Sequence, residues 1–218
     1  MAAQKRYGMV IDVDVCIGCK ACEVACRQEH NLRPRVGEEL DFKQHGVPFW
    51  IKVNWAGPYG TFPDLSFFFY ASMCAHCEDP PCVVACEPGT LKQRADGIVL
   101  ISDETKCDGC GNCAKACPYP EVIWIDPDTH RAEKCTFCYH RVEDGRDPAC
   151  VAACPMRCLT FGDLNNPESP ASQKLEEKDV EGNIIKIPVA PHMEVNPSLF
   201  YVLRRTQGGH FEMWKTGA

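Results

Sequence analysis

The residues of this chain that could do chemistry are its cysteines, because 16 of the 17 fall into four closely spaced motifs. Motifs one and three have the spacing C-x2-C-x2-C-x3-C, motif two has C-x2-C-x4-C-x3-C, and motif four has C-x2-C-x11-C-x3-C. Cysteines in close groups form disulfides, bind zinc or hold iron-sulfur clusters. In chain order the motifs are Cys16, Cys19, Cys22 and Cys26; Cys74, Cys77, Cys82 and Cys86; Cys107, Cys110, Cys113 and Cys117; and Cys135, Cys138, Cys150 and Cys154.

The spacing favours iron-sulfur clusters over the other two kinds of chemistry. Disulfides within a motif would close tiny loops and contribute little to stability. Zinc sites usually take two C-x2-C pairs from separated segments, whereas motifs one and three place a third cysteine only three residues after the second. The run C-x2-C-x2-C-x3-C-P is the bacterial ferredoxin pattern, and Cys107 to Pro118 matches it in full. The four motifs therefore predict four [4Fe-4S] clusters.

The spacing also predicts how ligands are shared within a pair of clusters. Three cysteines at intervals of three residues wrap around one corner of a cluster, and the fourth points away and binds its neighbour. Small residues such as Gly18, Gly109 and Gly111 lie in these loops, where a cluster comes close to the backbone. Two paired motifs therefore exchange their last cysteines.

The rest of the sequence lacks the common motifs of a catalytic site. It has no C-x-x-C-H for covalent haem, no Walker loop, no H-E-x-x-H and no dinucleotide-binding pattern. The net charge is -7, and four clusters at roughly -2 each would bring it to about -15. A chain this acidic is not expected to bind nucleic acid. The sequence predicts a carrier of single electrons.

Short helices and strands must position the motifs, and their pattern predicts an α+β fold. Paired clusters within short elements favour two ferredoxin-like modules, each holding two [4Fe-4S] clusters, with an insertion and a C-terminal extension. The expected elements are strands at 7–15, 122–125 and 159–162, helices at 19–30 and 170–177, a hairpin at 91–101, aromatic strands at 49–53 and 67–70 that pack beside the clusters, and an extended tail at 184–201 that lies over its own domain or a partner.

The location of the chain follows from its apolar segments. The longest stretch without a charge runs from Leu65 to Cys77, 13 residues, and a membrane helix needs roughly 20. No signal-peptide pattern opens the sequence. We therefore expect no direct membrane span, and a cytoplasmic location or export to the periplasm together with a partner.

The motifs and their surroundings resemble the four-cluster iron-sulfur subunits of molybdopterin oxidoreductases, of the dimethyl sulfoxide and polysulfide reductase type. The resemblance covers about residues 7–165, and the run from Phe161 to Ser169 matches the polysulfide reductase branch best. It is carried by Tyr7-Gly-Met-Val-Ile-Asp12, Cys74-Ala-His-Cys-Glu-Asp-Pro-Pro-Cys82, Lys134-Cys-Thr-Phe-Cys138 with His140-Arg141, and the other cysteine runs.

The resemblance implies that motif one pairs with motif four and motif two with motif three. Pairing one with two and three with four would fit the spacing equally well. The ligand sets that the resemblance implies are Cys16, Cys19, Cys22 and Cys154; Cys135, Cys138, Cys150 and Cys26; Cys74, Cys77, Cys82 and Cys117; and Cys107, Cys110, Cys113 and Cys86.

The same resemblance implies an organisation and a function. The chain would relay single electrons between a molybdenum or tungsten pterin catalytic subunit and a membrane quinone-reactive subunit or a soluble carrier. It would not be catalytic alone, and the pterin would lie only in the partner. The expected domains are a module of 1–30 plus 126–165 with motifs one and four, an insertion at 31–73, a module of 74–125 with motifs two and three, and an extension at 166–218.

Two other functions remain open from the residues. One is the same electron-transfer role in a formate dehydrogenase or hydrogenase, and the other is a zinc-stapled binding module. Among the neighbouring residues, Cys158 is expected to be a buried apolar thiol, and His76 a hydrogen-bond donor near a cluster or a packing residue. Most lysines beside ligands are expected to be solvated, although a cation near a cluster would raise its reduction potential: Lys20, Lys106, Lys115 and Lys134.

Overall fold

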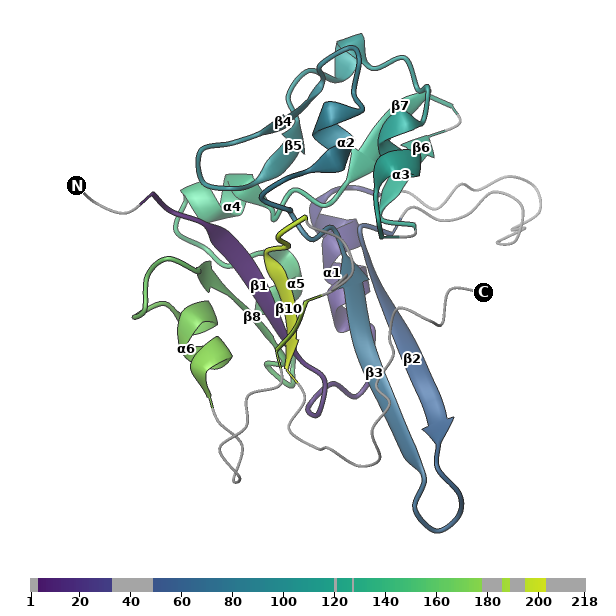
Figure 1. The fold of residues 1–218 in the computed structure, drawn as a ribbon, viewed down its shortest axis with the longest axis vertical. Coiled ribbons are helices and arrows are strands. Elements are labelled where there is room, and N and C mark those ends of the chain that lie inside the picture. Colours follow the sequence, from purple (N-terminus) through teal and green to yellow (C-terminus); the bar gives the residue numbers. More distant parts are fainter. Residues whose placement is uncertain are drawn as a thin grey trace.

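A four-stranded sheet joins the two ends of the described chain in this computed structural model (Figure 1). The structure describes residues 4–32, 49–119, 121–126, 128–177, 186–188 and 195–202. The strand order is β8 (Leu159–Asp163), β1 (Tyr7–Asp12), β10 (Leu199–Val202) and β9 (Lys186–Pro188). β1 pairs antiparallel with β8 and parallel with β10.

Strand β1 is buried on both faces, which explains its run of three apolar residues from Met9 to Ile11. The side chains of Met9, Val10 and Ile11 are fully buried. Val10 packs with residues of helix α6 (Pro170–Glu176) on one face. Met9 and Ile11 belong on the other face to the main core, which also contains most of the motif cysteines.

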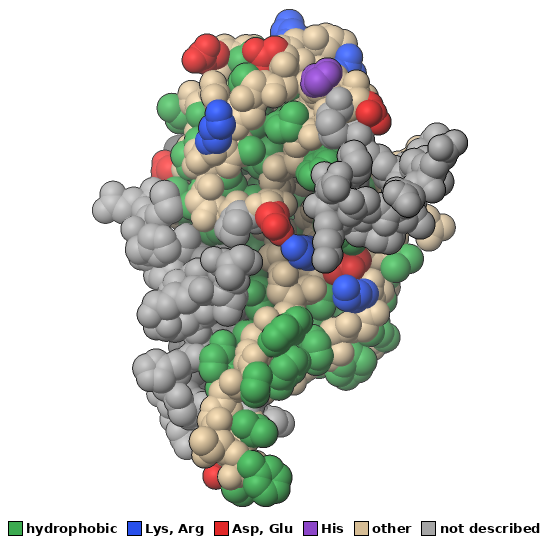
Figure 2. Space-filling view, turned by 90° about the vertical axis from the view of Figure 1, so that its right-hand side faces the viewer, with side chains coloured by type: hydrophobic (Ala, Val, Ile, Leu, Met, Phe, Trp, Pro, Cys, Tyr) green, Lys and Arg blue, Asp and Glu red, His purple; other side chains and the backbone are tan. Residues whose placement is uncertain are grey.

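An antiparallel hairpin of β2 (Ile51–Tyr59) and β3 (Ser66–Met73) projects from the body of the molecule (Figure 1). Its base is buried, but Trp55 is 59% exposed and Phe62, between the strands, is 89% exposed. Figure 2 shows hydrophobic side chains along the outer part of this hairpin. The aromatic runs are strands, as predicted, but only the base of the hairpin packs beside the motif cysteines.

A second set of short elements lies together at the top of Figure 1. Helix α2 packs against α3, and hairpin β4–β5 touches β7 of hairpin β6–β7. The bounds are α2 (Pro81–Val84), β4 (Leu91–Gln93), β5 (Val99–Ile101), a 3-10 turn (Glu104–Lys106), α3 (Asn112–Ala116), β6 (Ile123–Asp126) and β7 (Arg131–Lys134).

The other helices of the described part are α1 (Ala21–Glu29), α4 (Tyr139–Glu143) and α5 (Ala149–Ala152), of which α5 contacts β8. α1 packs against α5. The Glu29 carboxylate at the end of α1 also binds α4, through Arg141 at 2.8 Å and His140 at 2.8 Å. The segment of motif one is therefore joined to the segment of motif four, more than a hundred residues later.

The expected α+β elements are present, with small differences at their boundaries. β7 is an addition to them, because its sequence Arg-Ala-Glu-Lys is mostly charged and does not indicate a strand. Of the expected extended tail at 184–201, the described part contains β9 and β10, and β10 lies on β1 of its own chain. The remainder of the tail and part of the 31–73 insertion fall outside the described residues. None of the helices in the described part is long and apolar enough to cross a bilayer.

Candidate iron-sulfur cluster sites

One small apolar hollow is lined by the first three cysteines of motif one and the last cysteine of motif four. Val53 and Ala71, from the base of the β2–β3 hairpin, also line it. The last cysteine of motif one is not among its lining residues. We call the four cysteines group A: Cys16, Cys19, Cys22 and Cys154.

A second apolar hollow has the same construction in the upper part of the molecule. It is lined by the first three cysteines of motif three and the last cysteine of motif two. Leu91, Ile125 and Ala132 contribute apolar walls from three strands. We call these cysteines group D: Cys86, Cys107, Cys110 and Cys113.

The other eight cysteines form two sets whose thiols act on one another electrostatically. Burial raises the pKa of Cys26 to about 12, and the neighbouring Cys138 of motif four contributes to the increase. Burial likewise raises the pKa of Cys117 to about 12, with added effects from three cysteines of motif two. We call these sets group B, with Cys26, Cys135, Cys138 and Cys150, and group C, with Cys74, Cys77, Cys82 and Cys117.

The four groups follow one another in the order A, B, C, D. Cys22 of group A and Cys26 of group B lie one turn apart on α1. Cys74 of group C is near enough to raise the pKa of Cys135 in group B, after the larger effect of burial. Cys113 of group D likewise raises the pKa of Cys82 in group C, after the larger effect of burial. The two exposed cysteines are Cys19 of group A and Cys110 of group D, so the outer groups reach the surface.

Glycines allow the cysteine loops to pack closely against other elements. Gly109 lies between two cysteines of motif three with φ +71°, and a Cβ there would collide with the backbone carbonyl of His130 in the β6–β7 turn. Gly18 lies in motif one with φ +69°, and a Cβ there would collide with the ring of Phe69 on β3. Left-handed backbone is accessible to glycine at little cost.

Hydrogen-bond donors from the protein point at several of the sulfurs. The backbone N–H of Ala132 donates to Cys107 at 3.3 Å, and that of Phe137 donates to Cys135 at 3.4 Å. The Nε2 atom of His30 lies 3.1 Å from the sulfur of Cys138. Donors of this kind offset negative charge on the ligands of a cluster and raise its reduction potential.

The donor chemistry of the four groups fits iron. Burial raises the pKa of Cys22 and of Cys77 to about 12, so thiolates at these positions need positive charge close by. Ferric and ferrous ions supply that charge and bind thiolate sulfur strongly. Among the described residues, no three histidine, cysteine or carboxylate side chains converge as they do around one metal ion.

Cys158, which lies outside the four motifs, is buried as expected, and its sulfur is 3.4 Å from that of Cys154. A hydrogen bond from Cys158 also lowers the pKa of Cys16 to about 6, although burial opposes this effect. The hollow of group A therefore has five thiols around it. No sequence signal indicates this contact, because Cys16 and Cys158 are far apart along the polypeptide.

His76 and Lys134, which lie next to motif cysteines in the sequence, are both buried. His76 is 1% exposed, its Nδ1 accepts a hydrogen bond from the Val99 N–H, and its ring stacks on Phe137. It is thus a packing residue, one of the two roles expected. Lys20, Lys106 and Lys115 are exposed as expected, whereas Lys134 is 1% exposed.

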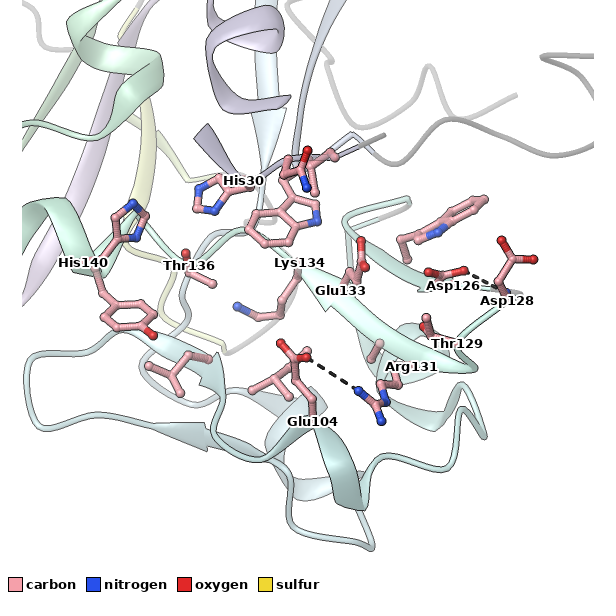
Figure 3. A pocket seen from close by; sticks show the side chains of 18 residues that line it. His30, Glu104, Asp126, Asp128, Thr129, Arg131, Glu133, Lys134, Thr136 and His140 are labelled. Carbon is pink, nitrogen blue, oxygen red and sulfur yellow. Dashed lines mark hydrogen bonds and ion pairs between the residues drawn. The ribbon is translucent and has the colours of Figure 1, made fainter. Parts of the chain in front are cut away.

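A larger pocket of about 570 Å³ lies beside group B (Figure 3). Its wall includes His30, which contacts Cys138, and the buried Lys134. An ion pair of Glu104 with Arg131 at 3.9 Å lies on another side. Acidic and basic side chains are mixed around this pocket, and none of the sequence motifs indicates it.

Comparisons with known proteins bear on these sites. The 4Fe-4S dicluster domain family matches residues 65–164, which include motifs two, three and four. The chain is 38% identical over 175 residues to the B subunit of polysulfide reductase from Wolinella succinogenes, covering 80% of this chain and 85% of that protein. It is 40% identical over 175 residues to protein NrfC of Escherichia coli, covering 79% and 72%. It is 38% identical over 161 residues to the B subunit of anaerobic dimethyl sulfoxide reductase from Escherichia coli, covering 73% and 75%.

The sequence identities of these relatives to the chain are similar, so the comparisons do not favour the polysulfide reductase branch over the others. They do decide between the two cofactors that the residues left open, iron-sulfur clusters and zinc. The matching family and the relatives named for a cofactor are iron-sulfur proteins. The similarity extends over most of both proteins in each case. The chain belongs to the family of 4Fe-4S iron-sulfur electron-transfer subunits that includes these reductase subunits.

Proposed function

We propose that this chain holds four [4Fe-4S] clusters, one in each of groups A to D, and relays single electrons along them. The observation that carries the proposal is the grouping of the 16 motif cysteines, three from one motif with the last from another. The order A, B, C, D and the exposure of Cys19 and Cys110 support a path with an entry at one end and an exit at the other.

The organisation that we propose has two ferredoxin-like modules. The packing of α1 on α5 supports a module of 1–30 plus 126–165, and the packing of α2 on α3 supports a module of 74–125. Residues 31–73 would be an insertion and 166–218 an extension. Hairpin β6–β7 pairs 123–126 with 131–134, so the boundary between the modules is better placed near residue 134.

Each part of the protein has a physical role in this proposal. The clusters supply one-electron chemistry when bound, and the thiolates hold them. Backbone N–H groups such as that of Ala132 stabilise the negative charge on the sulfurs. Apolar walls such as Leu91 and Ile125 limit the contact of water with the sulfurs of group D. The protein therefore transfers electrons, and the chemistry on the substrate takes place in a partner subunit.

The partner that we propose is a molybdenum or tungsten pterin catalytic subunit. Support comes from the relatives named as the B subunits of polysulfide reductase and of dimethyl sulfoxide reductase. Electrons would pass between that subunit and a membrane quinone-reactive subunit or a soluble carrier. The location would be the cytoplasm, or the periplasm by export with the catalytic partner. A formate dehydrogenase or hydrogenase complex is the second candidate, since the cysteine groups would serve any of these.

The partner is tested by purifying the tagged protein anaerobically from its native host and measuring metals in whatever remains bound. We expect a larger subunit and about one molybdenum or tungsten per copy of this chain. An iron-loaded chain that elutes alone with neither metal would contradict the pterin partner while leaving the clusters in place. Nickel would support a hydrogenase, and reduction of the clusters by added formate would support a formate dehydrogenase.

A further inference from the structure

Groups B and C meet through two equivalent loop positions. His76 is the third residue of the C-x2-C loop that opens motif two, and Phe137 is the third residue of the loop that opens motif four. Both have positive φ, 42° and 52°, and both are 1% exposed. Their rings stack with centroids 3.7 Å apart and an interplanar angle of 26°. The contact therefore joins a loop of one proposed module to a loop of the other.

A buried cation lies at the same contact. The Lys134 amine donates to the carbonyl of Cys135 at 2.7 Å and to the carbonyl of Val99. The Val99 N–H donates in turn to Nδ1 of His76 at 3.0 Å. Lys134 is therefore linked to group B through Cys135, and to the motif-two loop of group C through Val99 and His76.

In the described part of the chain, the recorded polar contacts of the Lys134 amine are with backbone carbonyls and not with a carboxylate. Its two hydrogen bonds go to neutral carbonyls, and it is 1% exposed. Its charge also reaches Cys82 of group C, whose pKa it lowers against the larger effect of burial. A buried ammonium is costly unless negative charge lies nearby. The clusters proposed for groups B and C would provide that negative charge on both sides.

We propose that Lys134 is a fixed cation shared by the clusters of groups B and C, which raises the reduction potentials of both. Reduction adds an electron to an already anionic cluster, and a nearby cation in a medium of low dielectric constant stabilises the reduced form. Because one cation acts on both clusters, it shifts the potentials of B and C in the same direction relative to those of A and D. The inference rests on the proposed ligand groups, and Lys134 acts through its charge without binding iron.

Lys106 provides a matched comparison, because it precedes Cys107 as Lys134 precedes Cys135. Its side chain is 67% exposed and pairs with Asp103 at 3.0 Å. Water and a carboxylate therefore screen its charge. The two lysines share a place in their motifs and differ in burial and in the group that they adjoin, so Lys106 controls for the loss of a lysine that precedes a motif cysteine.

The test is a redox titration of the clusters, followed by electron paramagnetic resonance, in the full complex carrying Lys134→Met. Methionine keeps the length and apolar stem of the side chain and removes the charge. We expect unchanged iron content, a fall in the midpoint potentials of two clusters, and no change in the other two. Lys106→Met should leave the potentials of the B and C clusters unchanged. An iron-replete Lys134→Met complex with all four potentials unchanged, or all four shifted equally, would overturn the inference.

A second variant decides the matter where Lys134→Met loses iron. Lys134→Arg keeps the charge, and we expect its cluster potentials to stay close to those of the wild type. Low potentials for two clusters in an iron-replete Lys134→Arg complex would contradict a role for the charge. Failure of the proposed function looks different, because too little iron would then be found in the wild type itself.

Discussion

Each proposed ligand supplies one thiolate to one cluster, so single cysteines should matter individually. Burial raises the pKa of Cys113, and the nearby thiols of Cys86 and Cys107 add to the effect. We predict that Cys107→Ser loses the cluster of group D and retains the other three. Iron should fall by about a quarter, from roughly 16 to roughly 12 per chain. Metal analysis of the purified variant checks this, and unchanged iron would refute the assignment.

Cys158 supplies the control at the same scale. It is buried and in contact with Cys154, but it has no place in any of the four groups. We therefore expect Cys158→Ala to keep the full iron content. If Cys158→Ala lost iron while Cys154→Ala kept it, the last ligand of group A would have to be reassigned to Cys158.

At the scale of elements, close approach of a cysteine loop to a hairpin depends on Gly109. The adjacent carbonyl of His130 leaves no room for a Cβ, whereas Gly145, with nearly the same φ of +72°, has open space around it. A left-handed alanine costs about 1–2 kcal/mol at either position. We predict that Gly109→Ala costs clearly more than Gly145→Ala and releases the group D cluster on mild heating. The loss of visible absorbance with temperature measures both, and equal effects would contradict the packing argument.

The ion pairs of Glu29 join α1 to α4. The His140 hydrogen bond, and then the neighbouring Arg141, lower the pKa of the Glu29 carboxyl below its ordinary value. A lowered pKa means that this stabilisation is present above the pKa of the unfolded carboxyl and is lost as pH falls through the lower folded pKa. We predict that Glu29→Gln costs up to about 1 kcal/mol at neutral pH, because the pair is partly exposed. Asp144→Asn, which breaks a pair with both side chains more than half exposed, should cost less.

The measurement is the temperature of cluster loss as a function of pH. The difference between wild type and Glu29→Gln should shrink as the solution is acidified. A difference that grows on acidification would mean that Glu29 is protonated more readily in the fold than in the unfolded chain, against the direction of its pKa.

Elements with local signals were predictable from the sequence, and those that depend on distant partners were not. Aromatic runs indicated β2 and β3, and the turn of Ala95-Asp96-Gly97 indicated β4 and β5. β7 was not predicted, because the burial of Ala132 and Lys134 on one face of the strand places a lysine in the interior. Lysine is rarely buried. The parallel pairing of β10 with β1 could not be read locally, since almost the whole chain separates them.

The cysteine groups show the same division between local and distant information. The C-x2-C spacings and the crossover of a last cysteine follow from sequence spacing. Which motifs lie together depends on the packing of α1 on α5 and of α2 on α3, which no spacing reveals. The contact of Cys158 with group A and the burial of Lys134 depend in the same way on tertiary structure.

At the scale of the whole molecule, strand β10 connects the C-terminal part of the described chain to the rest of the fold. Tyr201 is 1% exposed, and its hydroxyl donates to the carbonyl of Ala71 at 2.8 Å, so β10 is tied to the hairpin as well as to β1. We predict that Tyr201→Phe costs about 1 kcal/mol or more, because a buried carbonyl loses its partner. The temperature of cluster loss should fall by roughly 2–4 °C per kcal/mol.

Tyr139→Phe is the matched control, since it removes a hydroxyl from a side chain that is 37% exposed. Its temperature of cluster loss should stay near that of the wild type. Equal behaviour of the two variants would mean that the bond between Tyr201 and Ala71 contributes nothing to holding the C-terminal segment in place.

We propose that the chain holds four clusters, and not the two of a single dicluster domain. The most direct measurement is iron and acid-labile sulfide per chain in protein purified anaerobically from its native host. Four clusters predict about 16 iron and about 16 sulfide. About 8 of each would contradict the account, because two of the four cysteine groups would then hold no cluster.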